Sequence, residues 1–357
     1  MEFPPKASPG RGRRRRVARF AIDSQSLYGP RSRGSAMVRL EVFAYNPTEV
    51  LEEHDVTVGR CRELVEKYGV TWVNIVDPDG RTMEELETLF GFHPLALEDA
   101  LNTDLAPKVE MYDDVAFIVA RTIVWAEEIE TDQLSLFVSR KFVVTIHDKV
   151  FPQLEDIRIR LRKKNPRLLK AGADFLTYTI LDVIVDSYSP HLDRFQDILD
   201  DLEDEVVKAP TKTAIGKIHD IRVDLTLVRN ALRPQRDVIG YLMRLEIPVF
   251  RKETRQYLRD VQDHMARALD TLETLRDVAT GLLEAAATLA SNQLNEVIKV
   301  LTVVFTITLP LTVITSAFGM NVEFFGFNRP EGLYLALGLM IVPTATMLWW
   351  IRRKGWL

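Results

Sequence analysis

The sequence has almost no cysteine and carries no catalytic motif. Cys61 is the single cysteine among 357 residues, which excludes an intramolecular disulfide and a zinc site built from paired cysteines. A phosphate-binding glycine loop, a nucleophile elbow and a catalytic metal motif are missing too, so we predict that the protein is not an enzyme. Residues 1–36 lack the apolar stretch of a secretory signal.

Charge is distributed unevenly along the chain. Residues 1–36 contain nine Lys or Arg against two Asp or Glu, and we predict a disordered basic tail. A nucleic-acid arm and an extension ahead of a start at Met37 are alternatives for this tail. The remainder carries a net charge of about −12, which attracts cations and repels nucleic acid. We therefore expect divalent cations, and not nucleic acid, among its partners.

Short runs rich in Val, Ile, Phe and Thr fill the region that follows the tail. These runs predict strands. Between the expected strands at 71–76 and 115–123, residues 84–90 and 95–101 have helical patterns. A turn at residues 77–80 precedes Thr82, a candidate N-cap. We predict an α+β domain with a mixed sheet. The expected strands cover 38–45, 71–76, 115–123, 134–138 and 141–146.

After residue 150 the strand patterns stop and helical spacing takes over. Residues 175–207 and 215–232 are predicted helices, punctuated by Pro210 and Pro234. No proline occurs between residues 249 and 309, which predicts one helix about 60 residues and about 90 Å long. A helix of this length suggests a stalk that packs against copies of itself.

Two runs near the end, residues 300–318 and 332–351, contain no charged side chain and are long enough to cross a bilayer as helices. Basic residues flank them, with Lys299 before the first run and residues 352–354 after the second. The positive-inside rule then places both termini in the cytoplasm and the connector, residues 319–331, outside the plasma membrane. Three tryptophans lie where an interfacial aromatic belt is expected: Trp349, Trp350 and Trp356.

These patterns divide the chain into eight predicted segments. They are a disordered basic tail (1–36), an N-terminal α/β domain (37–150), a helical region (151–248), a stalk helix (249–299), a first transmembrane helix (300–318), an external loop (319–331), a second transmembrane helix (332–351) and a basic C-terminus (352–357).

A short motif, Gly319-Met320-Asn321, stands at the outer end of the first uncharged run, and Pro310-Leu311-Thr312 precedes it. Further upstream are the stretches 93–99 and 257–264. Together they resemble the CorA family of magnesium transporters from about residue 38 onward. Phe318 departs from the tyrosine that is usual in the family before the motif. The resemblance implies a funnel-shaped homopentamer in which the stalk continues into the pore-lining helix.

The resemblance also implies where ions pass. It assigns the selectivity filter to Gly319, Met320 and Asn321, with a ring of Asn321 amide oxygens facing hydrated Mg²⁺. Met320 is a packing residue in this interpretation, because its sulfur is too soft to bind magnesium. The implied pore-lining residues are polar rings and apolar constrictions: Thr312, Leu309, Leu301 and Asn295.

A second, regulatory Mg²⁺ site between cytoplasmic domains is implied by the same resemblance. Asp99 and Asp260 are its candidate ligands, with Glu98 beside them, Asp186 as a weaker candidate and Glu284 further along the stalk. Paired carboxylates repel each other when empty and bind a hard cation when close. The alternative is that these are solvated surface acids. The histidines have no zinc-site spacing, and we predict structural roles for them: His93, His147, His191, His219 and His264.

We therefore predict a membrane channel for Mg²⁺ influx, with Co²⁺ and Ni²⁺ as further candidates, gated by cytoplasmic Mg²⁺ at subunit interfaces. A zinc transporter on the same scaffold is one alternative. A membrane-anchored helical scaffold or sensor that conducts nothing is another, although the hydroxyl-rich first span argues against it.

Overall fold

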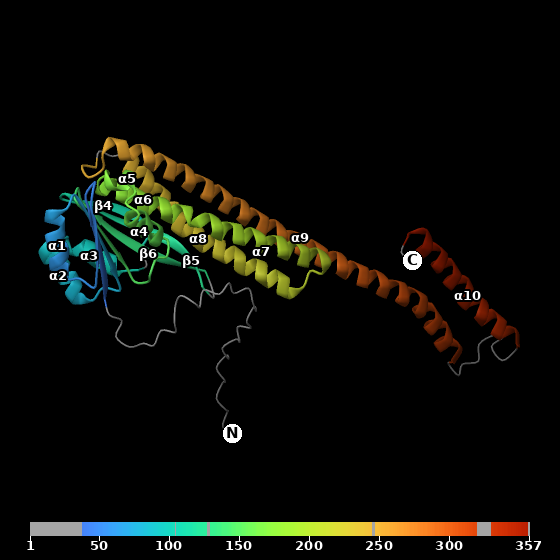
Figure 1. Cartoon of the computed structure of the whole chain (residues 1–357). Coiled ribbons are helices and arrows are strands. Elements are labelled where there is room, and N and C mark those ends of the chain that lie inside the picture. Colours follow the sequence, from blue (N-terminus) through green and yellow to red (C-terminus); the bar gives the residue numbers. More distant parts are fainter. Residues whose placement is uncertain (1–37, 104, 127–128, 245–246, 320–329, 356–357) are drawn as a thin grey trace, which may run out of the picture. The chain divides into compact units, whose positions relative to one another are not determined.

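The computed structural model describes residues 38–103, 105–126, 129–244, 247–319 and 330–355 (Figure 1). The predicted basic tail lies outside these residues. So does most of the predicted external loop, including Met320 and Asn321.

One seven-stranded sheet forms the centre of the N-terminal region, in the order β2-β1-β3-β7-β6-β5-β4. β3 and β7 pair in parallel and every other neighbouring pair is antiparallel, which confirms the predicted mixed sheet. The strands are β1 (Arg39–Tyr45), β2 (Val50–His54), β3 (Val70–Val76), β4 (Lys108–Tyr112), β5 (Val115–Trp125), β6 (Ile129–Val138) and β7 (Phe142–His147).

Helices cover both faces of the sheet, so its central strands are buried on both sides. Val42 and Val73 pack with α1 (Val58–Lys67), α2 (Gly80–Phe90) and α3 (Pro94–Leu101) on one face. Their chain neighbours Phe43 and Trp72 point to the other face. The helices there are α4 (Leu154–Arg162), α5 (Pro166–Leu169), α6 (Ala173–Asp186), α7 (Tyr188–Lys208), α8 (Lys212–Arg244) and the first part of α9 (Lys252–Gly319).

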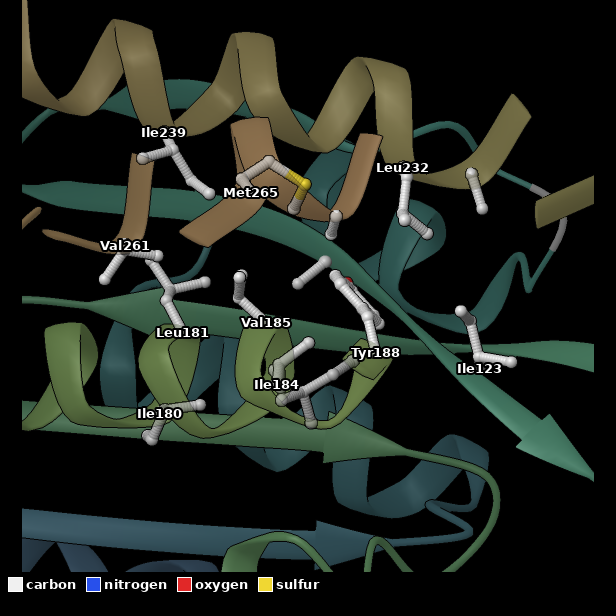
Figure 2. Close-up of a cluster of buried hydrophobic side chains, with 14 of the residues drawn as sticks. Ile123, Ile180, Leu181, Ile184, Val185, Tyr188, Leu232, Ile239, Val261 and Met265 are labelled. Carbon is white, nitrogen blue, oxygen red and sulfur yellow. The ribbon is translucent and has the colours of Figure 1, made fainter. Parts of the chain in front are cut away.

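Apolar side chains of α6, α8 and α9 form a continuous core above the sheet (Figure 2). Leu181 and Val185 on α6 lie opposite Val261 and Met265 on α9, and all four are buried. This packing fixes the distance between α6 and α9. It therefore also fixes the distance between the polar side chains that these two helices carry beside the core, which form the site described below.

The first turn of α9 is fixed to α6 by one buried carboxylate. Asp174 accepts hydrogen bonds from the Arg251 backbone nitrogen (3.0 Å), from Arg251 Nη2 (2.9 Å) and from Thr254 Oγ1 (2.6 Å). Asp174 thus satisfies donors at the start of α9 that have no partner inside the helix. Burial raises the pKa of Asp174, but these hydrogen bonds outweigh it and hold that pKa below its usual value.

A single helix of 68 residues follows, and the predicted long helix is confirmed. At 1.5 Å per residue α9 is about 100 Å long. Pro310 lies inside it without ending it. α10 (Pro330–Arg353) returns beside the end of α9 and also contains a proline, Pro343.

Two local predictions were wrong. Pro234 does not end a helix, because α8 continues to Arg244 and buries Val238 and Leu242 beyond the proline. Burial of that stripe outweighs the roughly 3 kcal/mol that a proline costs inside a helix. Thr82 is not the N-cap of α2: Asp79 is, and its carboxylate accepts the Thr82 backbone N–H at 2.8 Å.

Candidate metal site and membrane helix

A cluster of ionisable side chains joins α6 to α9. Asp182 and Asp186 lie one turn apart on α6, and His264 faces them from α9. Their potential ligand atoms all lie within 4.8 Å of one another. His264 Nδ1 is 2.6 Å from Asp186 Oδ1, which aims the imidazole at the carboxylates.

Asp260 extends this cluster along α9. It lies one turn before His264, with its Oδ1 3.6 Å from His264 Nε2, and its side chain is 65% exposed. Burial, and then the carboxylates of Asp186 and Asp260, raise the pKa of Asp182 above its usual value despite the opposing effect of His264. Burial and Asp182 raise the pKa of Tyr178 to about 12, and its hydroxyl donates to Asp182 at 3.4 Å.

This donor set fits a divalent cation. Three carboxylates concentrate negative charge. Burial is the main cause of the raised pKa of Asp182, and repulsion from Asp186 and Asp260 adds to it; a cation between the carboxylates would relieve that repulsion. Carboxylate oxygens suit Mg²⁺, and an imidazole nitrogen also suits Co²⁺, Ni²⁺ or Zn²⁺. The exposed edge formed by Asp186 and Asp260 leaves room for water or for ligands from another chain.

Sequence reasoning found two members of this cluster and missed two. Asp186 and Asp260 were candidates, whereas Asp182 was not considered and His264 was given a purely structural role. The signal was present: Asp182–Asp186 and Asp260–His264 are both i, i+4 pairs, so each pair shares one helix face. The sequence offered no reason to bring the two faces together.

Asp99 lies elsewhere, on α3, and has a cation of its own. Lys108 Nζ on β4 is 2.6 Å from Asp99 Oδ2 and 3.0 Å from a Glu110 oxygen. α3 packs on one face of the sheet and α9 on the other, so Asp99 and Asp260 belong to opposite layers of the chain. Glu98 is exposed beside Asp99.

The predicted pore residues share one side of α9. At 100° per residue, Asn295, Leu301, Leu309 and Thr312 fall within an arc of about 120°, and Glu284 falls within the same arc. Leu301 is 52% and Leu309 60% exposed in the single chain. One continuous helix therefore aligns positions whose spacing in the sequence looks irregular.

The side of α9 that packs against its own chain is different. Ala279, Leu282 and Ala286 are buried, and their arc is centred about 130° from that of the predicted pore residues. Packing within the chain thus leaves the predicted pore side free.

Threonine hydroxyls in the last third of α9 bond back to the helix. Thr302, Thr308, Thr312 and Thr315 each donate to the carbonyl four residues earlier, at 2.6–2.8 Å. Each hydroxyl proton is therefore bonded within the helix itself. This bonding also leaves each hydroxyl oxygen with free lone pairs, so Thr312 can still accept a hydrogen bond from a hydrated cation.

Among the described residues, one helix is long and apolar enough to cross a membrane: α9, over 252–317. Its best 18-residue window has a mean hydropathy of 2.2, and none of that window is buried. Large exposed side chains such as Val304, Phe305 and Val313 need an apolar surrounding, which lipid or further copies of the chain would provide.

A layered α/β domain, a carboxylate-rich helix pair and an apolar continuation of the same helix are thus combined in one chain. The family model described as "CorA-like Mg2+ transporter protein" matches residues 67–353. The chain belongs to the CorA family of magnesium and cobalt transporters.

Individual proteins agree with this assignment. The cobalt/magnesium transport protein CorA of Thermotoga maritima is 35% identical over 324 residues, which cover 89% of this chain and 92% of that protein. The complete structure of the CorA magnesium transporter from Methanocaldococcus jannaschii aligns with a TM-score of 0.78 at 25% identity, covering 90% of this chain and 99% of that one. The zinc transport protein ZntB of Pectobacterium atrosepticum is 23% identical, over 74% of this chain and 82% of its own length.

Proposed function

We propose that this protein is a homopentameric channel of the plasma membrane that carries Mg²⁺, and also Co²⁺, into the cell. Both α9 and α10 cross the membrane, the N- and C-termini are cytoplasmic, and the loop after Gly319 is external. Pro330–Arg353 would be about 36 Å long as a helix, enough for a second span.

One observation carries this proposal: α9 is unbroken from the acidic cluster at Asp260 to the apolar segment that ends at Gly319. An event at the cluster therefore acts on the same rigid element that would line the pore. Two spans in one chain cannot enclose a pore, so conduction requires several copies.

The ion path follows the shared side of α9. Asn321 amides at the mouth would hydrogen-bond hydrated Mg²⁺, which releases its water reluctantly. Thr312 would accept hydrogen bonds from the same water shell, since its own proton is donated to Thr308. Leu309 and Leu301 form apolar rings that close by losing water, and Asn295 ends the path.

Gating would depend on cytoplasmic Mg²⁺ bound by carboxylates, some of which meet across a subunit contact and some of which lie together within one chain. Asp99 would meet Asp260 of a neighbouring copy, because the two residues lie on opposite layers of one chain. Within the chain, Asp182 and Asp186 add negative charge around Asp260. When Mg²⁺ falls, the site empties and carboxylate repulsion loosens the subunit contact, which favours the open state.

The direct test is ion flux into liposomes that contain the purified full chain, with Mg²⁺, Co²⁺, Ni²⁺ and Zn²⁺ offered in turn. We expect Mg²⁺ and Co²⁺ uptake and a pentamer by native mass spectrometry. A protein that remains monomeric, or one that admits none of these ions, would contradict the proposal and favour a non-conducting scaffold.

A second candidate is transport or sensing of a softer ion, and His264 is the observation that favours it. An imidazole among carboxylates is a better ligand for Co²⁺, Ni²⁺ or Zn²⁺ than for Mg²⁺. Comparing inhibition of flux by each ion in wild type and in His264→Asn decides between them. A variant that loses Co²⁺ or Zn²⁺ inhibition but keeps Mg²⁺ inhibition would show that the cluster senses the softer ions.

A further inference from the structure

The C-terminal end of α10 and Lys354, the residue after it, form a cationic and aromatic pocket that the proposed ion path does not use. A cavity of about 380 Å³ is lined by Trp349, Trp350, Arg353 and Lys354. The Arg353 guanidinium lies 5.4 Å from the centre of the Trp349 ring, and Lys354 Nζ lies 5.0 Å from that of Trp350. Each tryptophan thus positions one cation at the pocket.

The helix geometry gathers these four side chains on one side. At 100° per residue they span about 140°, whereas Arg352 falls about 60° outside that arc. Ile351, about 60° outside the other end of the arc, is buried, and both tryptophans are at least half exposed. The pocket therefore faces away from the rest of the chain.

A third cation, Lys299 of α9, contacts the chain just after the end of α10. Gly355 adopts a left-handed conformation with φ of 67°, which ends the helix. Its carbonyl accepts a hydrogen bond from Lys299 on α9 at 3.3 Å. This contact ties the end of α10 to a position on α9 that lies 20 residues before the end of that helix, and it brings the Lys299 charge to the level of Arg353 and Lys354.

The positive charge of this segment is not balanced within the described part of the chain. None of the ion pairs formed by the described residues includes Arg352, Arg353 or Lys354. Cations beside exposed indole rings at the end of a membrane helix suit a ligand with an anionic head and an apolar body. A free phosphate would gain nothing from the indole rings.

We propose that the pocket formed by Trp349, Trp350, Arg353 and Lys354 binds the head group of an anionic phospholipid in the cytoplasmic leaflet. The phosphate would lie between the two cations, and the acyl chains would run along α10. This proposal rests on the cytoplasmic placement of the C-terminus in the proposed function. A lipid held there would fix the end of α10 relative to Lys299 and hence to α9.

The test measures lipid retention by native mass spectrometry. Full-length protein in detergent is mixed with equal amounts of phosphatidylglycerol and phosphatidylcholine, and the ratio of the two retained lipids is measured. We expect wild type to prefer phosphatidylglycerol. Arg353→Gln and Lys354→Gln should each lower the preference about fivefold. Arg352→Gln, which removes the same charge one position outside the pocket, should leave it unchanged, and Arg353→Lys should retain most of it.

Three outcomes would overturn the proposal. Equal losses for all three glutamine variants would show only general surface charge, and a wild type without preference would show no lipid site. Dissociation of the oligomer in Arg353→Gln would make the pocket a contact between subunits. Ion flux is measured on the same preparations, so a protein that conducts without lipid preference refutes this pocket alone, whereas one that never enters liposomes refutes the proposed function.

Discussion

Lys108 is the side chain that most directly opposes a cation at Asp99, so replacing it tests the proposed gating site. Its ammonium lies 2.6 Å from Asp99 and 3.0 Å from Glu110, and the Lys108 and Asp99 side chains are 29% and 25% exposed. Partial burial lowers the pKa of Lys108, but its hydrogen bonds to both carboxylates outweigh this and raise that pKa above its usual value. Lys108 therefore stays charged at physiological pH.

The size of the effect follows from this geometry. Exposed ion pairs contribute up to about 1 kcal/mol, and a pair that is three-quarters covered stands at the upper end of that range. An arriving Mg²⁺ must displace or share this interaction. Lys108→Met removes the competing charge and keeps most of the length of the side chain. We expect the Mg²⁺ concentration for half-maximal effect to fall about fivefold, the equivalent of about 1 kcal/mol.

The assay is limited proteolysis of the full-length protein over a Mg²⁺ titration, in which we expect bound ion to protect the part of the chain that precedes the apolar end of α9. Lys108→Arg should behave as wild type. Lys217→Met is the matched control, because Lys217 bridges Glu205 at 2.7 Å with similar exposure, away from Asp99. An unchanged or higher Mg²⁺ requirement in Lys108→Met would show that Asp99 does not hold the ion.

Three further predictions concern other parts of the chain. Asn321→Ala should abolish Mg²⁺ uptake into liposomes and leave the oligomer intact, and wild-type uptake would remove this residue from the filter. Asp260→Ala should require more Mg²⁺ for protection from protease and conduct with less inhibition by Mg²⁺, whereas a protection curve equal to that of wild type would make Asp260 a surface charge only. Asp174 has a lowered pKa, so its contribution to stability is present above the usual pKa near 4 and is lost as pH falls through its own lower value. Thermal unfolding between pH 2 and 7 should thus show a smaller acid loss in Asp174→Asn than in wild type, and parallel curves would contradict this role.

The central strands were predictable and the edge strands were not. β1, β3, β5 and β7 are dense in Val, Ile and Phe because both faces of the sheet are covered. The two strands that the sequence analysis missed, β2 and β4, are the two edges of the sheet. All ten of their residues are half-buried or exposed, and their charged residues hide the strand pattern.

Helix length was predictable from the absence of proline, whereas contacts between helices were not. The run without proline indicated α9. Pro234 did not end α8, however, because apolar residues that follow this proline are buried and stabilise the helix. Asp182 and His264 meet only because the apolar residues beside them interlock, across 81 intervening residues. A pattern local to either helix does not contain that information.

The length of α9 gives it the properties of a lever. Its first turn is held by Asp174, and its far end at Gly319 lies about 100 Å away. A tilt of about 2° about the held end would displace the far end by roughly 3.5 Å, which exceeds the about 2.8 Å diameter of a water molecule. If α9 lines a pore as proposed, adjustments smaller than one side-chain contact near the sheet would be large enough, at the opposite end, to decide whether a column of water is continuous.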